Sequence, residues 1–279
     1  MKSGGDPAGY RAYALPDFLP ELERGGTAVP AGDRRLIVAN RETLIWAQRL
    51  EGGIPAVLKM YRRRGEISWQ REKRFRFRVQ REFNALAYLD TRGVPCSQPI
   101  FWSRGCSPQF GRYEILATRE IENVAQLDTL FSANDPAVAA PSLRAAYELI
   151  RRMHQSGCHH GRMFGRNILV ARWDTQPEAY ILDMPNAILF PYDITGTRMA
   201  WMDLYFLTVG VAKRAGAAAC REPLRRYGLG PGAIDTFVDH VHGRRVSHLT
   251  KTRFRVEAEI WELLARAGVR CGPSRHLRG

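Results

Sequence analysis

The order in which strand-like and helix-like segments follow one another restricts the fold more than any other feature of this sequence. Three short β-type segments come first, at residues 35–39, 43–50 and 55–61, and a Gly-Gly pair predicts a turn between the second and the third. An amphipathic helix is expected over residues 79–90, because apolar side chains recur there at helical spacing. The beginning of the chain is therefore rich in strands and contains one helix.

The middle of the chain continues this pattern and then changes to helices. Two further strands are expected at residues 99–103 and 112–118. After a polar crossover, we expect a short helix near residues 124–131 and a loop over 132–141, which is rich in Ala, Asn, Asp and Pro. A long helical pattern follows, with Ser142 as its expected N-cap.

The remainder is predicted to be mostly helical. Two short strands are expected at residues 168–171 and 180–182, and everything after about Met199 has helical periodicity, including a final helix over 254–268. A strand-rich first part followed by a helix-rich part with a small β insertion predicts an α+β protein with two lobes.

These patterns also predict three parts of the chain. Residues 1–33 form a loose lead-in with one helical turn near 16–24, because they contain many prolines and glycines and little periodicity. Residues 34–118 form a small β-rich lobe, and residues 119–279 form the helical lobe.

The chain is strongly basic, with 42 Lys and Arg against 28 Asp and Glu and a formal net charge of +14. Such a charge favours nucleic acid, an anionic membrane surface or a phosphorylated substrate as the partner. Residues 62–78 contain eight of the basic residues, interleaved with Trp69, Phe75 and Phe77. This segment is either a solvated helix face or a patch for an anionic membrane. No nucleic-acid recognition motif accompanies it, so nucleic acid is not an expected partner.

The sequence also bears on the compartment in which the protein works. No stretch reaches the ~18 apolar residues of a membrane-spanning helix, and the first residues have no apolar segment of a secretory signal. The five cysteines form no C-x-x-C pair. We therefore expect a cytoplasmic protein with reduced thiols. The membrane surface to which it would attach is the inner face of the cytoplasmic membrane.

Four polar residues stand at positions where phosphate chemistry needs them. Lys59 lies inside the apolar strand AVLKMY, and Glu82 lies in the following helix. Asn167 ends the polar loop HHGRMFGRN, and Asp183 ends the strand YIL. Taken singly, each has a structural explanation, as a surface ion pair, a turn residue or a strand cap. Together they offer a lysine with a carboxylate partner and two hard oxygen ligands of the kind that Mg²⁺ prefers, which are the groups that phosphoryl transfer uses.

The order strand-Lys, helix-Glu, loop-Asn and strand-Asp resembles that of the protein-kinase-like fold. Within that fold the chain is most similar to the bacterial lipopolysaccharide core kinases of the Kdo/WaaP family, over roughly residues 34–245. The motif DMPNA after the last strand resembles the metal motif of that family, and MDLYFLTVG resembles a later segment of it. The resemblance implies a two-lobed kinase that phosphorylates a sugar of the lipopolysaccharide inner core, or another anionic glycolipid, with ATP and Mg²⁺.

The same resemblance implies a role for each matching residue. Lys59 would hold the nucleotide phosphates, Glu82 would orient Lys59, and Asn167 and Asp183 would bind Mg²⁺. Asp203 in MDLYFLTVG would support the catalytic loop from below.

The sequence departs from the kinase pattern at two positions. The turn ANRE after the first strand has no glycine, so Arg41 is the residue there that could contact phosphates. Arg162 occupies the position of the catalytic Asp, five residues before Asn167, and His160 is a weak candidate base for which a structural role is favoured. We therefore expect either a kinase with weakened catalysis or a pseudokinase that binds nucleotide or glycolipid without transferring phosphate.

Overall fold

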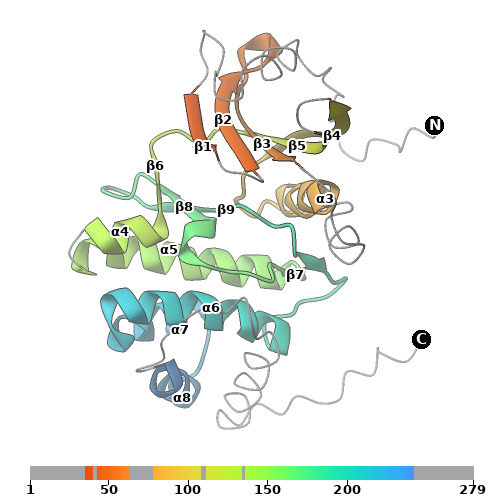
Figure 1. The fold of residues 1–279 in the computed structure, drawn as a ribbon. Coiled ribbons are helices and arrows are strands. Elements are labelled where there is room, and N and C mark those ends of the chain that lie inside the picture. The colour runs from red at the N-terminus through yellow and green to blue at the C-terminus, as the bar shows by residue number, and fades with distance from the viewer. Residues whose placement is uncertain (1–34, 40–42, 63–77, 108–110, 134–135, 242–279) are drawn as a thin grey trace, which may run out of the picture. The chain divides into compact units, whose positions relative to one another are not determined.

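The computed structural model divides into two compact units, each of which is considered by itself. The described residues are 35–39, 43–62, 78–107, 111–133 and 136–241 (Figure 1). The first unit contains the described residues before Glu122, except for the short segment Arg92–Cys96, which belongs to the second unit.

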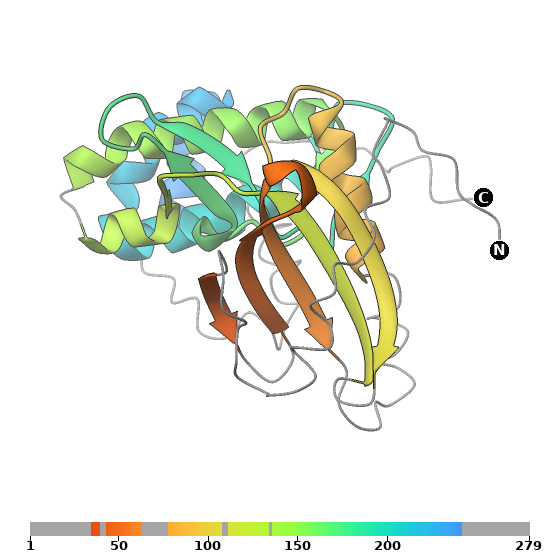
Figure 2. The same cartoon turned by 90° about the horizontal axis from the view of Figure 1, so that it is seen from above.

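The first unit is one antiparallel sheet with a helix beside it. Its strands are arranged in the order β1-β2-β3-β5-β4, and α3 packs against β4 and β5 (Figure 2). A 3₁₀ turn, η1, joins β2 to β3 at the predicted glycine pair. The elements are β1 (Arg35–Ala39), β2 (Thr43–Arg49), η1 (Glu51–Gly53), β3 (Pro55–Arg62), α3 (Arg78–Asp90), β4 (Pro99–Ser107) and β5 (Gly111–Arg119).

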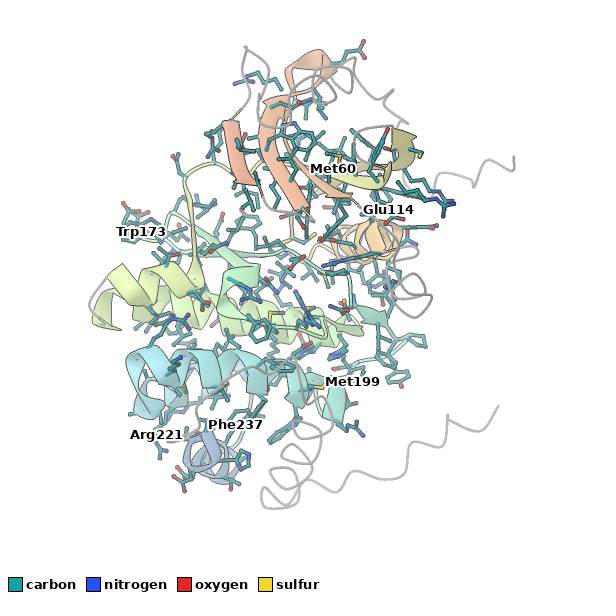
Figure 3. The ribbon with its side chains drawn as sticks, in the orientation of Figure 1. Met60, Glu114, Trp173, Met199, Arg221 and Phe237 are labelled. Carbon is teal, nitrogen blue, oxygen red and sulfur yellow. The ribbon has the colours of Figure 1, made fainter. Side chains whose placement is uncertain are left out.

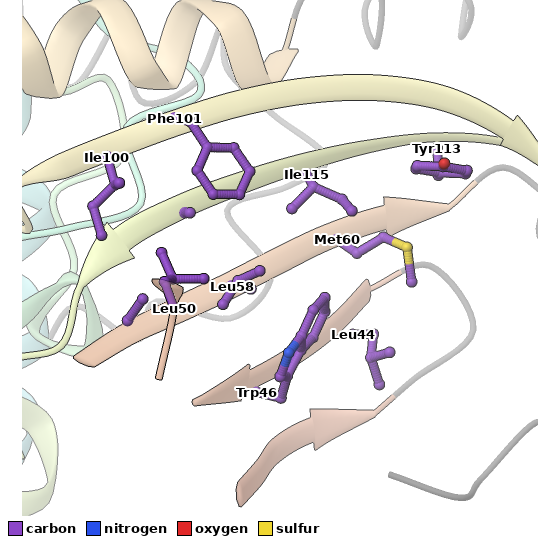
Figure 4. Close-up of a cluster of buried hydrophobic side chains, with 11 residues drawn as sticks. Leu44, Trp46, Leu50, Leu58, Met60, Ile100, Phe101, Tyr113 and Ile115 are labelled. Carbon is purple, nitrogen blue, oxygen red and sulfur yellow. The ribbon is translucent and has the colours of Figure 1, made fainter. Parts of the chain in front are cut away.

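The two faces of this sheet have different roles. Leu58 and Met60 on β3 are fully buried in an apolar cluster on one face (Figure 4). Because side chains alternate along a strand, Lys59 and Tyr61 lie on the other face. The backbone N–H of Val79, in the first turn of α3, donates to the Glu114 carboxylate of β5 at 3.3 Å (Figure 3 labels Glu114). The helix is thus attached to the face that carries the polar residues.

The second unit is mostly helical and contains two small sheets, one in the order β6-β8-β9 and one formed by β7 and β10. Its first elements are β6 (Val124–Gln126), α4 (Leu127–Ala133), α5 (Pro136–Gln155), β7 (Cys158–His159), η2 (Gly165–Asn167) and β8 (Ile168–Ala171). The remaining elements are β9 (Glu178–Ile181), β10 (Ile188–Leu189), α6 (Arg198–Ala215), η3 (Ala217–Cys220), α7 (Arg221–Tyr227) and α8 (Pro231–Val241).

Helices α5 and α6 form the centre of this unit (Figure 1). The hydroxyls of Tyr147 on α5 and Thr208 on α6 are 2.7 Å apart and fully buried. Helix α5 also packs against β9 and α7. The short strands of this unit therefore pack against helices, which supports the loops next to those strands.

Two predicted elements are wrong in their boundaries. Helix α5 begins at Pro136, so Ser142 is not an N-cap but a buried residue inside the helix, and most of the expected loop over 132–141 is helical. The predicted helix began only after Pro141, because a proline inside a helix removes a helical hydrogen bond. The buried side chains of Ala139 and Leu143 on either side show that tertiary packing outweighs this cost.

Sequence periodicity also missed three strands. Residues 124–126 form β6 rather than the start of a helix, and the helix begins only at Leu127. Strands β7 and β10 have two residues each, which is too short for any period to be recognised. The expected helical segments at 16–24 and 254–268 lie outside the described residues.

The expected fold class is confirmed. The described chain is an α+β protein with an antiparallel sheet and one helix in its first unit and a mainly helical second unit. The helix between the third and fourth strands is the arrangement that the resemblance to kinases implies.

We predict that Leu58→Ala lowers the free energy of unfolding of the protein by about 2–5 kcal/mol, because it leaves a cavity in the buried cluster of the first sheet. The measurement is urea denaturation followed by circular dichroism. Leu36→Ala is the control, since Leu36 on β1 is exposed. Equal midpoints for the two variants would contradict the prediction.

Candidate active site

Lys59 and Glu82 form an ion pair in the first unit. Lys59 is in the middle of β3, between Ile45 of β2 and Leu116 of β5. Its Nζ is 3.1 Å from Oε1 and 3.5 Å from Oε2 of Glu82 on α3. The Glu82 side chain is only 2% exposed, whereas that of Lys59 is 16% exposed. The carboxylate thus holds an ammonium group that is still accessible to solvent.

Tyr61 contacts both members of this ion pair, a role that the sequence analysis did not assign to it. Its hydroxyl donates to Oε2 of Glu82 at 3.3 Å, and Nζ of Lys59 is 5.0 Å from the centre of its ring. The guanidinium of Arg78 lies over the same ring at 4.3 Å. The available signal was the two-residue period of β3, which places Tyr61 on the same face as Lys59.

Asp203 is the centre of the second group of polar residues. It lies on α6, is fully buried, and accepts hydrogen bonds from the backbone N–H groups of His160 at 2.7 Å and Gly161 at 2.9 Å. Nε2 of His154, on α5, is 3.2 Å from Oδ2 of the same carboxylate. Nδ1 of His159 is 3.0 Å from Oδ2 but is not aligned for a hydrogen bond. One carboxylate therefore joins two helices to the loop that begins at His160.

The surroundings of Asp203 set the charge of this cluster. Burial alone would raise the pKa of Asp203, but the attraction of His159 and the hydrogen bond from His154 hold that pKa below its usual range. Burial lowers the pKa of His154 and of His160. An ionised Asp203 therefore faces neutral His154 and His160 near neutral pH. Because the carboxylate only accepts hydrogen bonds, Nε2 of His154 carries the proton, and Nδ1 accepts from the Tyr227 hydroxyl at 2.8 Å.

Gly161 is required by the shape of the loop. Its φ is +84°, a conformation that side chains rarely allow. A Cβ atom on it would lie 2.8 Å from the backbone oxygen of Asn186, which is closer than real Cβ atoms approach other atoms. A side chain here would also disturb the N–H group that donates to Asp203.

His160 connects the loop to the end of β9. Its Nε2 donates to the Leu182 carbonyl at 3.0 Å, and its Nδ1 accepts from the Arg162 N–H at 3.3 Å. Both ring nitrogens are thus bonded to backbone, and the side chain is fully buried. This geometry fits the structural role favoured for His160 and leaves no nitrogen for a substrate proton.

Asn167 and Asp183 are brought together by the pairing of β8 and β9. Ile168 is opposite Ile181, and the Leu182 N–H donates to the Asn167 carbonyl at 3.1 Å, so Asp183 is one residue beyond this pair. Asp183 is half-buried and has a φ of +59°. Such backbone strain is most frequent at functional sites.

The amide of Asn167 has a defined orientation. Its Nδ2 donates to the Arg162 carbonyl at 2.8 Å. A carbonyl can only accept, so Oδ1 is the atom of this amide that remains for another partner. An amide oxygen and a nearby carboxylate fit Mg²⁺, which takes few protein ligands and completes its shell with water and phosphate oxygens. The described ranges contain no cluster of three or more His, Cys, Asp or Glu that could hold a metal.

The remaining predicted residues fall in different places. The side chain of Arg162 is exposed, and in the described part of the chain it forms no ion pair. Lys59 and Glu82 belong to the first unit, whereas His160, Arg162, Asn167 and Asp183 belong to the second. Arg41 and residues 63–77 of the basic segment lie outside the described residues.

Within the ranges that the structure describes, no helix is both long enough and apolar enough to cross a bilayer.

We predict that acid destabilises the protein, starting near pH 6.5. The folded-state pKa of both His154 and His160 lies below the ordinary value of 6.5, so the unfolded chain binds more protons below that pH. Their contribution to the free energy of unfolding is present above pH 6.5 and decreases as the pH falls, by at most about 1.4 kcal/mol per pH unit for each group. The contribution of Asp203 is lost only below its ordinary value of 3.8.

The measurement is the urea midpoint between pH 7.5 and 5, and His154→Gln should reduce its slope with pH. A wild-type midpoint that is constant or rises on acidification would refute this assignment.

Comparison with known proteins places the chain in a family. The model of the lipopolysaccharide kinase (Kdo/WaaP) family matches residues 45–189, more than half of the chain. Among solved structures, the chain is similar to "WaaP in complex with acyl carrier protein", with 12% sequence identity and a TM-score of 0.48, over 84% of this chain and 88% of that chain. No curated protein sequence matches it. By the family match, the chain belongs to the Kdo/WaaP family of lipopolysaccharide kinases.

Proposed function

We propose that the protein transfers phosphate from ATP to a sugar hydroxyl of the lipopolysaccharide inner core, slowly, at the cytoplasmic face of the membrane. Membership of the family supports the reaction class and the lipopolysaccharide substrate. The observation that carries the proposal is the Asn167 amide, which is held by the Arg162 carbonyl so that its oxygen is left for a ligand, one residue along the strand pair from Asp183.

The proposed roles follow from the geometry within each unit. Lys59 binds nucleotide phosphates through its ammonium group, and Glu82 with Tyr61 fixes its position. Asn167 and Asp183 are the residues that would hold Mg²⁺, through their oxygens. When bound, Mg²⁺ neutralises the phosphate charge that develops during transfer. The residues of this chain otherwise position the reactants, which is most of what phosphoryl transfer requires.

Arg162 is the reason for proposing slow transfer. A guanidinium cannot accept the proton of the attacking hydroxyl, because its pKa stays above 12. We assign His160 a positioning role, since its two nitrogens are bonded to backbone. Some transfer is still expected, because the transition state is loose and positive charge near the γ-phosphate stabilises it.

The alternative is a pseudokinase that binds nucleotide or glycolipid without transferring phosphate. The observation in its favour is the same Arg162, which removes the usual base and adds a positive charge to the loop that carries Asn167. Measured phosphate transfer separates the two functions.

We also propose that the basic segment 62–78 contacts an anionic membrane surface or the lipopolysaccharide itself. The support is its charge and its interleaved aromatic residues. Nucleic acid is not a proposed partner.

We predict that ATP with Mg²⁺ raises the melting temperature of the protein, because a ligand that binds only the folded state stabilises it. Lys59→Ala and Asp183→Ala should each abolish the shift. Lys213→Ala is the control, since Lys213 is an exposed lysine in the last turn of α6. The assay is a thermal-shift titration. If the wild type shows no shift at millimolar ATP, the nucleotide site does not exist as proposed.

We predict that Arg162→Asp raises phosphate transfer to lipopolysaccharide by ~10²-fold or more, the lower end of the contribution of a positioned base. The measurement is transfer of radiolabelled phosphate from ATP. Arg225→Asp is the control, because it makes the same charge change at an exposed position of α7. Strong transfer by the wild type that is lost in Arg162→Asp would instead make this arginine a working phosphate ligand.

A further inference from the structure

A second arginine of the same loop, Arg166, lies against an aromatic ring. Its guanidinium carbon lies 4.8 Å from the centre of the Phe164 ring, and its side chain is exposed. The Phe164 ring is 5.3 Å from the ring of Phe206 on α6. The flexible side chain of Arg166 therefore rests on an aromatic surface that is attached to the central helix of the unit, and a stacked guanidinium keeps the N–H groups at its edge available.

Two acidic groups beside this loop, Asp128 and Asp203, have cationic or backbone partners. Asp128 lies against Gly165, the residue before Arg166, and Arg214 donates to it at 3.3 Å. Asp203 is buried and accepts from the loop backbone. Across the described residues, no ion pair involves the guanidinium of Arg166. This side chain thus presents a positive charge and a set of aligned donors to solvent.

Arg166 also immediately precedes Asn167, whose amide is fixed in the same η2 turn. A donor fork at this position can bind an anionic group of a molecule that reacts near Asn167. Two oxygens of a carboxylate or a phosphate match the spacing of the guanidinium N–H groups.

We propose that Arg166 binds an anionic group, a carboxylate or a phosphate, on the saccharide acceptor, and that it selects acidic acceptors over neutral ones. This inference rests on the proposed function only in assigning the bound saccharide as the acceptor. Arg166 is then a specificity-determining residue, distinct from Arg162, whose proposed effect is on transfer.

The experiment measures binding of three sugars by ligand-observed NMR: glucose 6-phosphate, glucuronate and glucose. The wild type is expected to bind at least one charged sugar more tightly than glucose. Arg166→Gln should weaken binding of that sugar about tenfold or more, as expected for loss of hydrogen bonds to a charged group. Arg166→Lys, which keeps the charge but not the fork, should give an intermediate affinity. Arg225→Gln is the matched control and should bind all three sugars like the wild type.

The sugar whose binding is weakened in Arg166→Gln identifies the anionic group. If this variant binds only glucose 6-phosphate more weakly than the wild type does, the group is a phosphate. If it binds only glucuronate more weakly, the group is a carboxylate. Equal binding of charged and neutral sugars by the wild type, or charged-sugar binding unaffected by Arg166→Gln, would overturn the inference.

The ATP-Mg²⁺ thermal shift of the same variants separates this inference from the proposed function. It should be unchanged in Arg166→Gln. If Arg166→Gln loses both the ATP shift and the charged sugar, Arg166 acts on the loop as a whole, and the inference is wrong. If the wild type lacks the ATP shift, the proposed function fails, whereas the sugar measurements still decide the role of Arg166.

Discussion

The buried carboxylate of Asp203 is the interaction on which the second unit depends. A charge without water is costly unless donors surround it, and here the donors come from two backbone N–H groups of the loop and from His154 on α5, with His159 close by. The loop between β7 and β8 contains only a single 3₁₀ turn. Asp203 ties the start of this loop to α6, and hydrogen bonds inside the loop orient Asn167.

This support acts on backbone atoms, which explains how Arg162 fits where an acid is expected. Arg162 contributes its N–H to His160 and its carbonyl to Asn167, while its side chain is exposed. These two hydrogen bonds therefore use only the backbone of Arg162 and do not require a particular side chain at that position. Gly161 is the opposite case, since its backbone conformation and its contact with Asn186 exclude any side chain.

In the first unit, an ion pair between a strand and a helix holds the polar residues in place. Lys59 is on the polar face of a sheet whose other face is an apolar cluster, and α3 brings Glu82 to it. The two-residue period of the strand places Lys59 on the face opposite Leu58 and Met60. Glu82 lies 23 residues further along the chain. Its pairing with Lys59 was predicted from the resemblance to kinases and not from any local pattern. Tyr61, which bonds to the same carboxylate, was overlooked because an aromatic residue in a strand is most simply explained as part of a core.

The sequence by itself determined the α+β class, the strands around Lys59, the helix that carries Glu82 and the order of the polar motifs, because these depend on periodicity and on residues close together in the chain. It failed at α5, where buried neighbours keep Pro141 inside a helix, and at β6, β7 and β10, which are too short to have a recognisable period. Only the tertiary structure decided that three histidines gather around Asp203, that Asn167 is oriented by a carbonyl, and that Arg166 rests on Phe164. The histidine cluster depends on contacts between elements far apart in sequence, which are set by packing rather than by local preference. The other two features lie within one loop, whose irregular backbone follows no repeating pattern that the sequence could indicate.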